Sequence, residues 1–294
     1  MSKNSQFTLS AKPTSFPSIA NKSVDLDGLR VAYKEEGTGR AILCLHALGH
    51  SSKDFLSLYQ LPLTEYRVIS LDFPGHGVSG VGLQPVSAAY FARVVEAFIN
   101  RLDLRDLVLV GNSIGGAVAI RLAAHNPNVR LISLSNPAGL DSRDWLAPLF
   151  LNVMVGFFQY GVKRGMGYRV LFGWYYRLVL VNRKATARRK EITGDAIRLA
   201  PALVEGWRSF RETSEDLRPS IHQVLCPVLF TWCMKDRFVQ FNRNKKAIQQ
   251  FAHYKLIRYG VGHTPYIECP QEFLKDFQNF LNANNPAADR SSIS

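Results

Sequence analysis

A serine between two glycines is the feature that most restricts how this chain folds. It lies in the segment Gly111-Asn112-Ser113-Ile114-Gly115, with an apolar run at residues 107–110 before it and small residues at 117–124 after it. A serine on a tight strand-to-helix turn has a strained backbone, and Cβ atoms two residues to either side would collide with the turn. The pattern therefore predicts a buried strand, a sharp turn that exposes the serine hydroxyl, and a helix.

Strand-like and helical patterns alternate along most of the chain. Short apolar runs predict further strands at residues 23–26, 29–34, 41–46, 67–71, 131–135, 228–232 and 254–259, the first two joined by an Asp27-Gly28 hairpin signal. Apolar residues at helical spacing predict helices after Ser87 and after Pro270. Most of the strand-like runs do not alternate with polar residues, which is typical of a sheet covered on both faces. We therefore expect an α/β fold with a mostly parallel sheet.

The alternation fails once, between residues 138 and 221, where aromatic and basic helical stretches replace strands. This pattern predicts a helical cap, or lid, at 138–221, inserted into a core that comprises residues 23–137 and 222–283. The polar segments 1–22 and 284–294 are expected to be a flexible lead-in and tail. The lead-in has no apolar core of a secretory signal, and the four cysteines lack metal-ligand spacing. A cytoplasmic protein with no bound metal is therefore expected.

A serine needs a base and an orienting acid before it becomes a good nucleophile. Asp236 follows the strand predicted at 228–232, and His263 lies in a glycine-flanked loop after the strand predicted at 254–259. Because the carboxyl ends of parallel strands meet at one edge of a sheet, Ser113, Asp236 and His263 are predicted to form a catalytic triad. Asp141 and Asp144, which follow an earlier strand, are the rival acids.

A site for acyl transfer also needs two backbone N–H groups that face the developing oxyanion. The strand predicted at 41–46 leads into a loop of small residues, and we assign the two donors to Leu48 in this loop and to Ile114. His46, Ala47 and Asn112 flank these donors and are expected to contact the substrate.

These residues together resemble the α/β-hydrolase superfamily over roughly residues 24–283. The matching segments are HALG at 46–49, DFPGHGVSG at 72–80, GNSIGG at 111–116, MKD at 234–236 and GHTPYIECP at 262–270. The resemblance implies the α/β-hydrolase fold and a structural role for Asp72 and His76. It also implies an acyl-enzyme route, since haloalkane dehalogenases and epoxide hydrolases have aspartate where this chain has Ser113. The chain departs from the family at Ala47 and at Met234, where glycine is usual.

Within the superfamily, the GNSIGG segment and the cap are similar to esterases and lipases and to carbon–carbon bond hydrolases that cut ring-cleavage products. The latter usually have tryptophan after the catalytic histidine, whereas this chain has Thr264. The resemblance therefore favours a serine esterase that needs no cofactor and cleaves a small-molecule ester with an apolar acyl or alcohol part. A carbon–carbon hydrolase, a thioesterase or acyltransferase, and a ligand-binding protein on a hydrolase scaffold remain as alternatives.

The net charge of +13 is concentrated in the predicted cap. Residues 145–190 contain nine Lys or Arg and no Asp or Glu, and they alternate with aromatic and apolar stretches at 145–162 and 171–181. Cap helices that line an apolar pocket account for these stretches, and peripheral contact of the cap with an anionic membrane is the alternative. No nucleic-acid-binding motif is present, so nucleic acid is not an expected partner.

Overall fold

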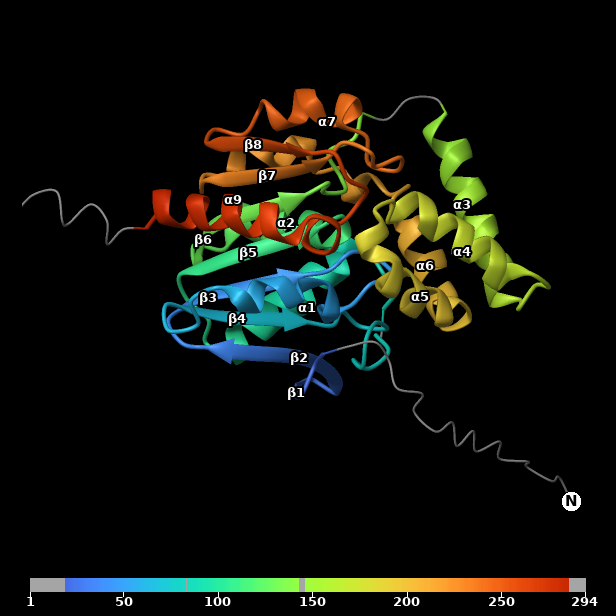
Figure 1. The fold of residues 1–294 in the computed structure, drawn as a ribbon, viewed down its shortest axis with the longest axis horizontal. Helices are drawn as coiled ribbons and strands as arrows, with labels where there is room; N and C mark the ends of the chain where they lie inside the picture. Colours follow the sequence, from blue (N-terminus) through green and yellow to red (C-terminus); the bar gives the residue numbers. More distant parts are fainter. Residues whose placement is uncertain (1–18, 83, 143–145, 286–294) are drawn as a thin grey trace, which may run out of the picture.

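The computed structural model describes residues 19–82, 84–142 and 146–285, and a twisted sheet forms the centre of this part of the chain (Figure 1). Within these ranges the sheet has eight strands in the order β1-β2-β4-β3-β5-β6-β7-β8. The strands are β1 Lys22–Leu26, β2 Leu29–Gly37, β3 Arg40–Leu45, β4 Tyr66–Leu71, β5 Leu107–Asn112, β6 Val129–Ser135, β7 Val228–Cys233 and β8 Tyr254–Tyr259. The strands predicted from the sequence are confirmed, with differences only at their ends.

The sheet is parallel except at one edge. β1 pairs with β2 and β2 pairs with β4 in antiparallel fashion, and every neighbouring pair from β4 to β8 is parallel. Asp27 and Gly28, with φ of 53° and 85°, form the turn between β1 and β2. The mostly parallel α/β sheet expected from the sequence is therefore confirmed, and the carboxyl ends of the parallel strands share one edge.

Helices cover both faces of the sheet, because side chains of the central strands alternate between two hydrophobic clusters. Leu43 and Leu45 belong to the cluster with α1 Ala88–Arg101, α2 Ile114–His125, α7 Phe241–Ile248 and the 3-10 helix η4 Arg218–Gln223. Ile42 and Cys44 belong to the cluster with the 3-10 helix η1 Ser52–Gln60, α8 Pro265–Glu268 and α9 Pro270–Ala283. As predicted, Ser87 caps α1 by accepting from Tyr90 N, and Pro270 begins α9.

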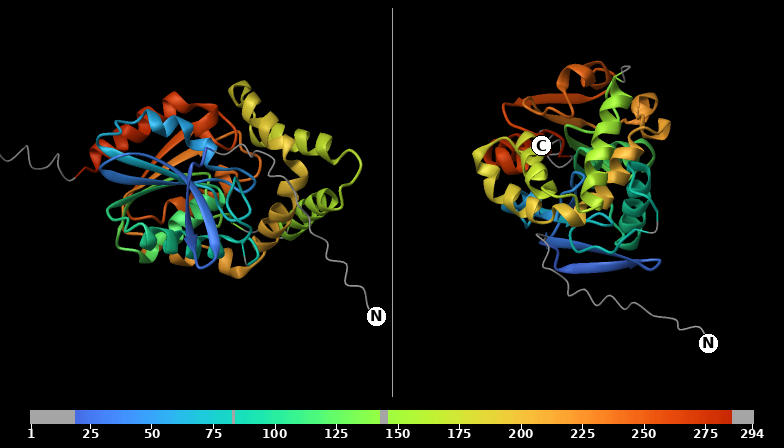
Figure 2. Two further views of the ribbon diagram at one scale, coloured as in Figure 1. Left: turned by 90° about the horizontal axis from the view of Figure 1, so that it is seen from below. Right: turned by 90° about the vertical axis from the view of Figure 1, so that its right-hand side faces the viewer.

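A separate helical layer lies beyond the carboxyl ends of the parallel strands (Figures 1 and 2). It consists of α3 Ala147–Val162, α4 Tyr168–Val179, α5 Thr186–Gly194 and α6 Ala196–Ser209, with the 3-10 helix η2 Arg183–Ala185, and we call α3 to α6 the cap helices. Their own hydrophobic cluster includes Phe158, Phe172 and Leu203. Leu140, which precedes α3, and Leu217, which follows the 3-10 helix η3 Thr213–Glu215, are instead buried in the core. The helical layer is therefore shorter than the segment 138–221 expected from the sequence.

The lead-in expected at 1–22 and the tail expected at 284–294 lie largely outside the described residues. Of these segments the structure describes residues 19–22, where β1 begins, and residues 284 and 285 after α9. Across the described part of the chain, no helix combines the length and the apolar character needed to cross a bilayer.

Candidate active site

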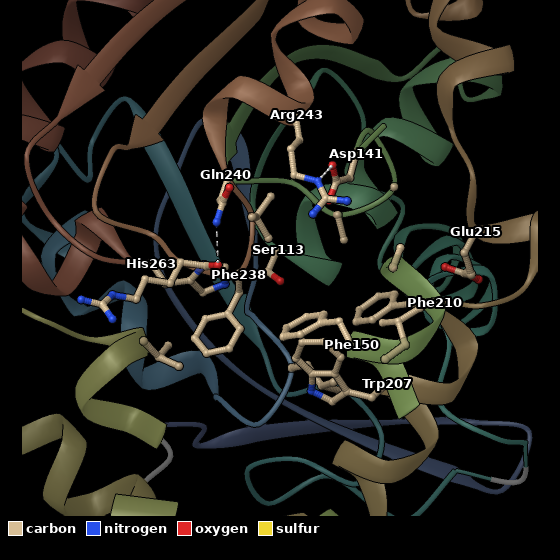
Figure 3. Close-up of a pocket in the computed structure, with 18 of the residues that line it drawn as sticks. Ser113, Asp141, Phe150, Trp207, Phe210, Glu215, Phe238, Gln240, Arg243 and His263 are labelled. Atoms are coloured by element: carbon tan, nitrogen blue, oxygen red, sulfur yellow. Dashed lines mark hydrogen bonds and ion pairs between the residues drawn. The ribbon is translucent and has the colours of Figure 1, made fainter. Parts of the chain in front are cut away.

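Ser113 lies on the turn between β5 and α2 with φ 54° and ψ −117°, which non-glycine residues rarely adopt. The two flanking glycines are required by their surroundings. A Cβ on Gly115 would lie 2.1 Å from the carbonyl oxygen of Leu45, and a Cβ on Gly111 would lie 2.5 Å from that of Gly115. The turn directs Ser113 into a cavity between the sheet and the cap helices (Figure 3).

His263 lines the same cavity and is held by Asp236, with 2.6 Å between His263 Nδ1 and Asp236 Oδ2. Asp236 is buried, and its Oδ1 accepts hydrogen bonds from the backbone N–H groups of Phe238 and Val239 at 2.8 and 3.1 Å. These bonds fix the carboxylate, and Asp236 in turn fixes the imidazole with Nδ1–H toward Oδ2. The Nε2 atom of neutral His263 is then available as a proton acceptor.

The pKa of His263 is raised above its usual value of about 6.5. Burial by itself lowers this pKa, but the charge of Asp236 and its hydrogen bond to the ring outweigh that effect. The imidazole is therefore a stronger base in the folded protein than a free histidine.

Asn136, which immediately follows β6, is a site residue that the sequence analysis missed. Its Nδ2 donates to Asp236 Oδ2 at 2.8 Å, while its Oδ1 accepts from Cys233 N at 2.8 Å. Asn136 is fully buried and has φ 42°, a left-handed conformation that asparagine tolerates better than most residues. The available sequence signal was a polar residue directly after a buried parallel strand.

Two backbone N–H groups near Ser113 have no protein acceptor among the described residues. Ile114 is the first residue of α2, so its N–H has no partner within the helix. In the loop after β3, the N–H of Gly49 donates to His76 Nε2 at 3.0 Å and that of His50 to Ala47 O at 3.1 Å, whereas the N–H of Leu48 has no acceptor among the described residues. Leu48 lines the cavity, as Ser113 does.

His46, Ala47 and Asn112, which were expected to contact the substrate, do not line the cavity. His46 is fully buried, which lowers its pKa to about 3, and its Nε2 accepts from Phe73 N at 3.0 Å. Asn112 is also buried and donates to the carbonyl oxygens of Ser135 and His263. Buried polar groups must be paired within the protein, so the side chains of His46 and Asn112 hold loops together instead of facing a ligand.

Asp72 and His76 hold the loops behind the cavity, consistent with the structural role implied by the resemblance. Asp72 accepts from the N–H groups of Ser52 and Val78 at 2.8 and 3.0 Å. Burial lowers the pKa of His76 to about 3, so its neutral ring can accept from Gly49 N. This bond fixes the loop that carries Leu48.

The cavity has a volume of about 520 Å³ and a mostly apolar wall (Figure 3). Its Phe, Tyr and Trp residues come from both the cap helices and the core, and they are Phe150, Tyr175, Tyr176, Trp207, Phe210 and Phe238. Asp141, one of the rival acids, also lines the cavity but forms an ion pair with Arg243 at 3.0 Å and lies apart from His263. The other rival, Asp144, lies outside the described residues.

A second buried histidine–carboxylate pair lies beside the cavity and was also missed. His50 lines the cavity, and its Nδ1 is 2.5 Å from Asp54 Oδ2. Asp54 also accepts from Arg188 Nε at 2.8 Å, which links the core to α5. Burial opposes ionisation of Asp54, but the charges and hydrogen bonds of His50 and Arg188 hold its pKa well below the usual range. The available signal was the spacing of four residues between His50, just before η1, and Asp54 in its first turn.

The chain belongs to the alpha/beta hydrolase family, whose sequence model matches residues 42–276. It is 27% identical to 2-hydroxy-6-oxo-6-phenylhexa-2,4-dienoate hydrolase from Comamonas testosteroni, over 90% of this chain and 95% of that protein. It is 25% identical to pimeloyl-[acyl-carrier protein] methyl ester esterase from Xanthomonas axonopodis pv. citri, over 83% of this chain and 96% of that protein.

A shorter match relates the chain to a larger protein. It is 34% identical, over 41% of its own length, to the dihydrolipoyllysine-residue acetyltransferase component of the acetoin cleaving system from Cupriavidus necator, and the match spans only 33% of that relative. Among solved structures, a bacterial membrane phospholipase A superimposes with a TM-score of 0.73 at 24% identity, over 90% of this chain and 86% of the other. That similarity supports the fold.

Proposed function

We propose that this chain is a serine hydrolase that cleaves a carboxylic ester through an acyl-enzyme intermediate. The observation that carries the proposal is the strained turn that presents Ser113 to the cavity that His263 also lines, with His263 hydrogen-bonded to a buried, fully paired Asp236. A hydroxyl nucleophile, a base and an orienting acid are the three groups that acyl transfer requires.

In the proposed reaction, His263 Nε2 takes the proton of Ser113 Oγ as that oxygen attacks the ester carbonyl. Asp236 stabilises the imidazolium that results. The N–H groups of Leu48 and Ile114 donate to the oxyanion, and the loss of one such donor typically costs about 3 kcal/mol of transition-state stabilisation. Protonated His263 then protonates the leaving alcohol. Water, activated by His263, attacks the acyl-enzyme carbonyl and releases the acid.

The cavity wall supports a substrate with an apolar acyl or alcohol part. Phe150 and Phe238 contact Trp207 with ring centroids 5.7 and 6.3 Å apart, forming a continuous aromatic surface. Apolar surface of this kind contributes binding in proportion to the area removed from water, about 25 cal/mol per Å². The pimeloyl methyl ester esterase relative, whose name describes an ester substrate, agrees with this substrate class.

The test is hydrolysis of p-nitrophenyl esters from acetate to laurate by wild type and Ser113→Ala. We expect activity in wild type and a loss of about a million-fold in turnover for Ser113→Ala. A fluorophosphonate probe should add mass to the peptide that contains Ser113 and to no other. Equal hydrolysis by both proteins would contradict the proposal.

A second candidate reaction is carbon–carbon bond hydrolysis, which the Comamonas testosteroni relative suggests by its name and by its match over most of both chains. The same two proteins should be tested with 2-hydroxy-6-oxo-6-phenylhexa-2,4-dienoate, whose cleavage is followed by the loss of its visible absorbance. Cleavage of the dienoate without ester hydrolysis would replace the esterase proposal. If wild type acts on neither class, acyl thioesters and ligand binding are to be measured next.

A further inference from the structure

The outward side of α3, α4 and the turn between them exposes many large apolar side chains. Met166 in the turn is 94% exposed, and Trp174 on α4 is 63% exposed. We call this surface the cap tip; its exposed apolar residues are Leu149, Val153, Tyr160, Val162, Met166, Val170, Leu171, Trp174 and Leu178. In the right-hand view of Figure 2, both helices lie at the end of the molecule that faces the viewer.

This exposure follows from the helical pattern. On α4, Tyr168, Phe172 and Tyr176 recur every four residues and are buried in the cap cluster, so Val170 and Trp174 necessarily point the other way. A helix with apolar residues on both sides is normally covered on both. The outward side of α4 has no covering element among the described residues.

The cap tip is also cationic. Lys163, Arg164, Arg169 and Arg177 are all exposed, and residues 145–190 include no acid. Arg164 and Arg169 line a hollow at the turn, and the Arg177 guanidinium lies 5.4 Å from the centre of the Trp174 ring. Apolar and cationic side chains are therefore interleaved on one surface.

The same surface reaches the mouth of the active-site cavity. Leu146 and Phe150, at the start of α3, line the cavity and are also 45% and 42% exposed. An apolar strip continues from them along α3 through Leu149 and Val153. A molecule held at the cap tip is therefore connected to the cavity by apolar surface.

We propose that the cap tip docks on the surface of an anionic lipid bilayer. Apolar side chains that enter the headgroup region, flanked by Lys and Arg that pair with lipid phosphates, are the features that bind such a surface. A second copy of this chain is the less suitable occupant. A symmetric contact would place the four exposed cations of one copy against those of the other, with no acid in the segment to offset them.

The test is cosedimentation with vesicles of phosphatidylcholine alone and of phosphatidylcholine mixed with phosphatidylglycerol. Wild type should bind the mixed vesicles and not the neutral ones. The variant Lys163→Gln/Arg164→Gln/Arg169→Gln should bind about 100-fold more weakly, because each cation near an anionic surface contributes about a fivefold factor. Binding is measured without substrate, so the result does not depend on the proposed ester hydrolysis.

A matched control separates the cap tip from the general positive charge of the protein. Lys245→Gln/Lys246→Gln/Lys255→Gln removes the same charge from exposed positions on α7 and β8, and its binding should stay within about twofold of wild type. For the apolar side chains, Met166→Gln/Trp174→Gln should weaken binding, whereas Val81→Gln/Leu225→Gln, 84% and 72% exposed on the core, should not.

Three results would overturn the proposal. They are no binding of wild type to the anionic vesicles, equal losses in the cap-tip and control variants, and a stable dimer in solution that Met166→Gln/Trp174→Gln dissociates. All variants should keep wild-type circular dichroism and wild-type activity on short soluble substrates, since none of the altered residues lines the active-site cavity.

Discussion

The Nδ2 group of Asn112 donates a hydrogen bond to the backbone carbonyl of His263 at 3.0 Å. Its Oδ1 accepts from Thr264 Oγ1 at 3.1 Å. The residue before the serine thus joins the turn that carries Ser113 to the loop that carries His263. We infer that Asn112 positions Ser113 and His263 relative to each other, whereas the sequence analysis expected it to contact the substrate.

Asn112→Ala should lower kcat by about 10- to 100-fold with little change in KM, because a shift of about 1 Å in a reacting group costs that much. Steady-state kinetics on the preferred ester would measure kcat and KM separately. Thr264→Val, which removes only the hydrogen bond from Thr264 Oγ1 to Asn112 Oδ1, should lower kcat by a smaller factor. A higher KM with unchanged kcat would instead restore the substrate-binding role expected from the sequence.

The pH dependence of kcat/KM should report the raised pKa of His263. Only the neutral imidazole accepts the serine proton, so activity should fall as pH decreases, with a midpoint above about 6.5. Asp236→Asn should lower kcat by about 10⁴-fold and move the midpoint to lower pH, because the carboxylate that raises the pKa is gone. A midpoint at the same pH in wild type and Asp236→Asn would contradict this assignment.

Gly115→Ala should strongly destabilise the fold, because its Cβ would lie 2.1 Å from a backbone oxygen that cannot move without disturbing β3. We expect a loss of about 3 kcal/mol or more in the free energy of unfolding, measured by urea denaturation. Gly156→Ala on α3 is the matched control, since no atom lies within 4 Å of its added Cβ. That control should stabilise the protein by about 0.5–1 kcal/mol, and equal effects of the two variants would refute the steric argument.

Arg188→Met should destabilise the protein by about 3–5 kcal/mol, because it leaves the buried Asp54 carboxylate without its guanidinium partner. Arg183→Met, at an exposed position near the start of α5, should change stability by less than about 0.5 kcal/mol. Asp54→Leu added to Arg188→Met should recover part of the loss. Thermal and urea unfolding of the three variants would measure these differences.

The sequence by itself determined the strands of the sheet and which of these strands the candidate site residues follow. The glycines around Ser113 and the apolar runs before Ser113, Asp236 and His263 are local signals, since turn chemistry and strand burial act on neighbouring residues. Parallel strands then bring residues that follow different strands to one edge, whatever their separation in the chain. This reasoning sufficed to predict the eight strands and the helices that begin after Ser87 and at Pro270.

Only the tertiary structure decided which polar groups pair with each other. Asn112 and His263 are 151 residues apart, and Arg188 and Asp54 are 134 apart, so no local pattern relates them. Exposure in the cap helices also depends on the tertiary structure. The sequence pattern predicted that this segment is helical, but it did not predict which side of each helix stays exposed. Pairing and exposure both depend on how distant segments pack. A buried polar atom forms its hydrogen bond with the group that the fold brings next to it, and an apolar helix face is buried only if the fold packs another segment against it.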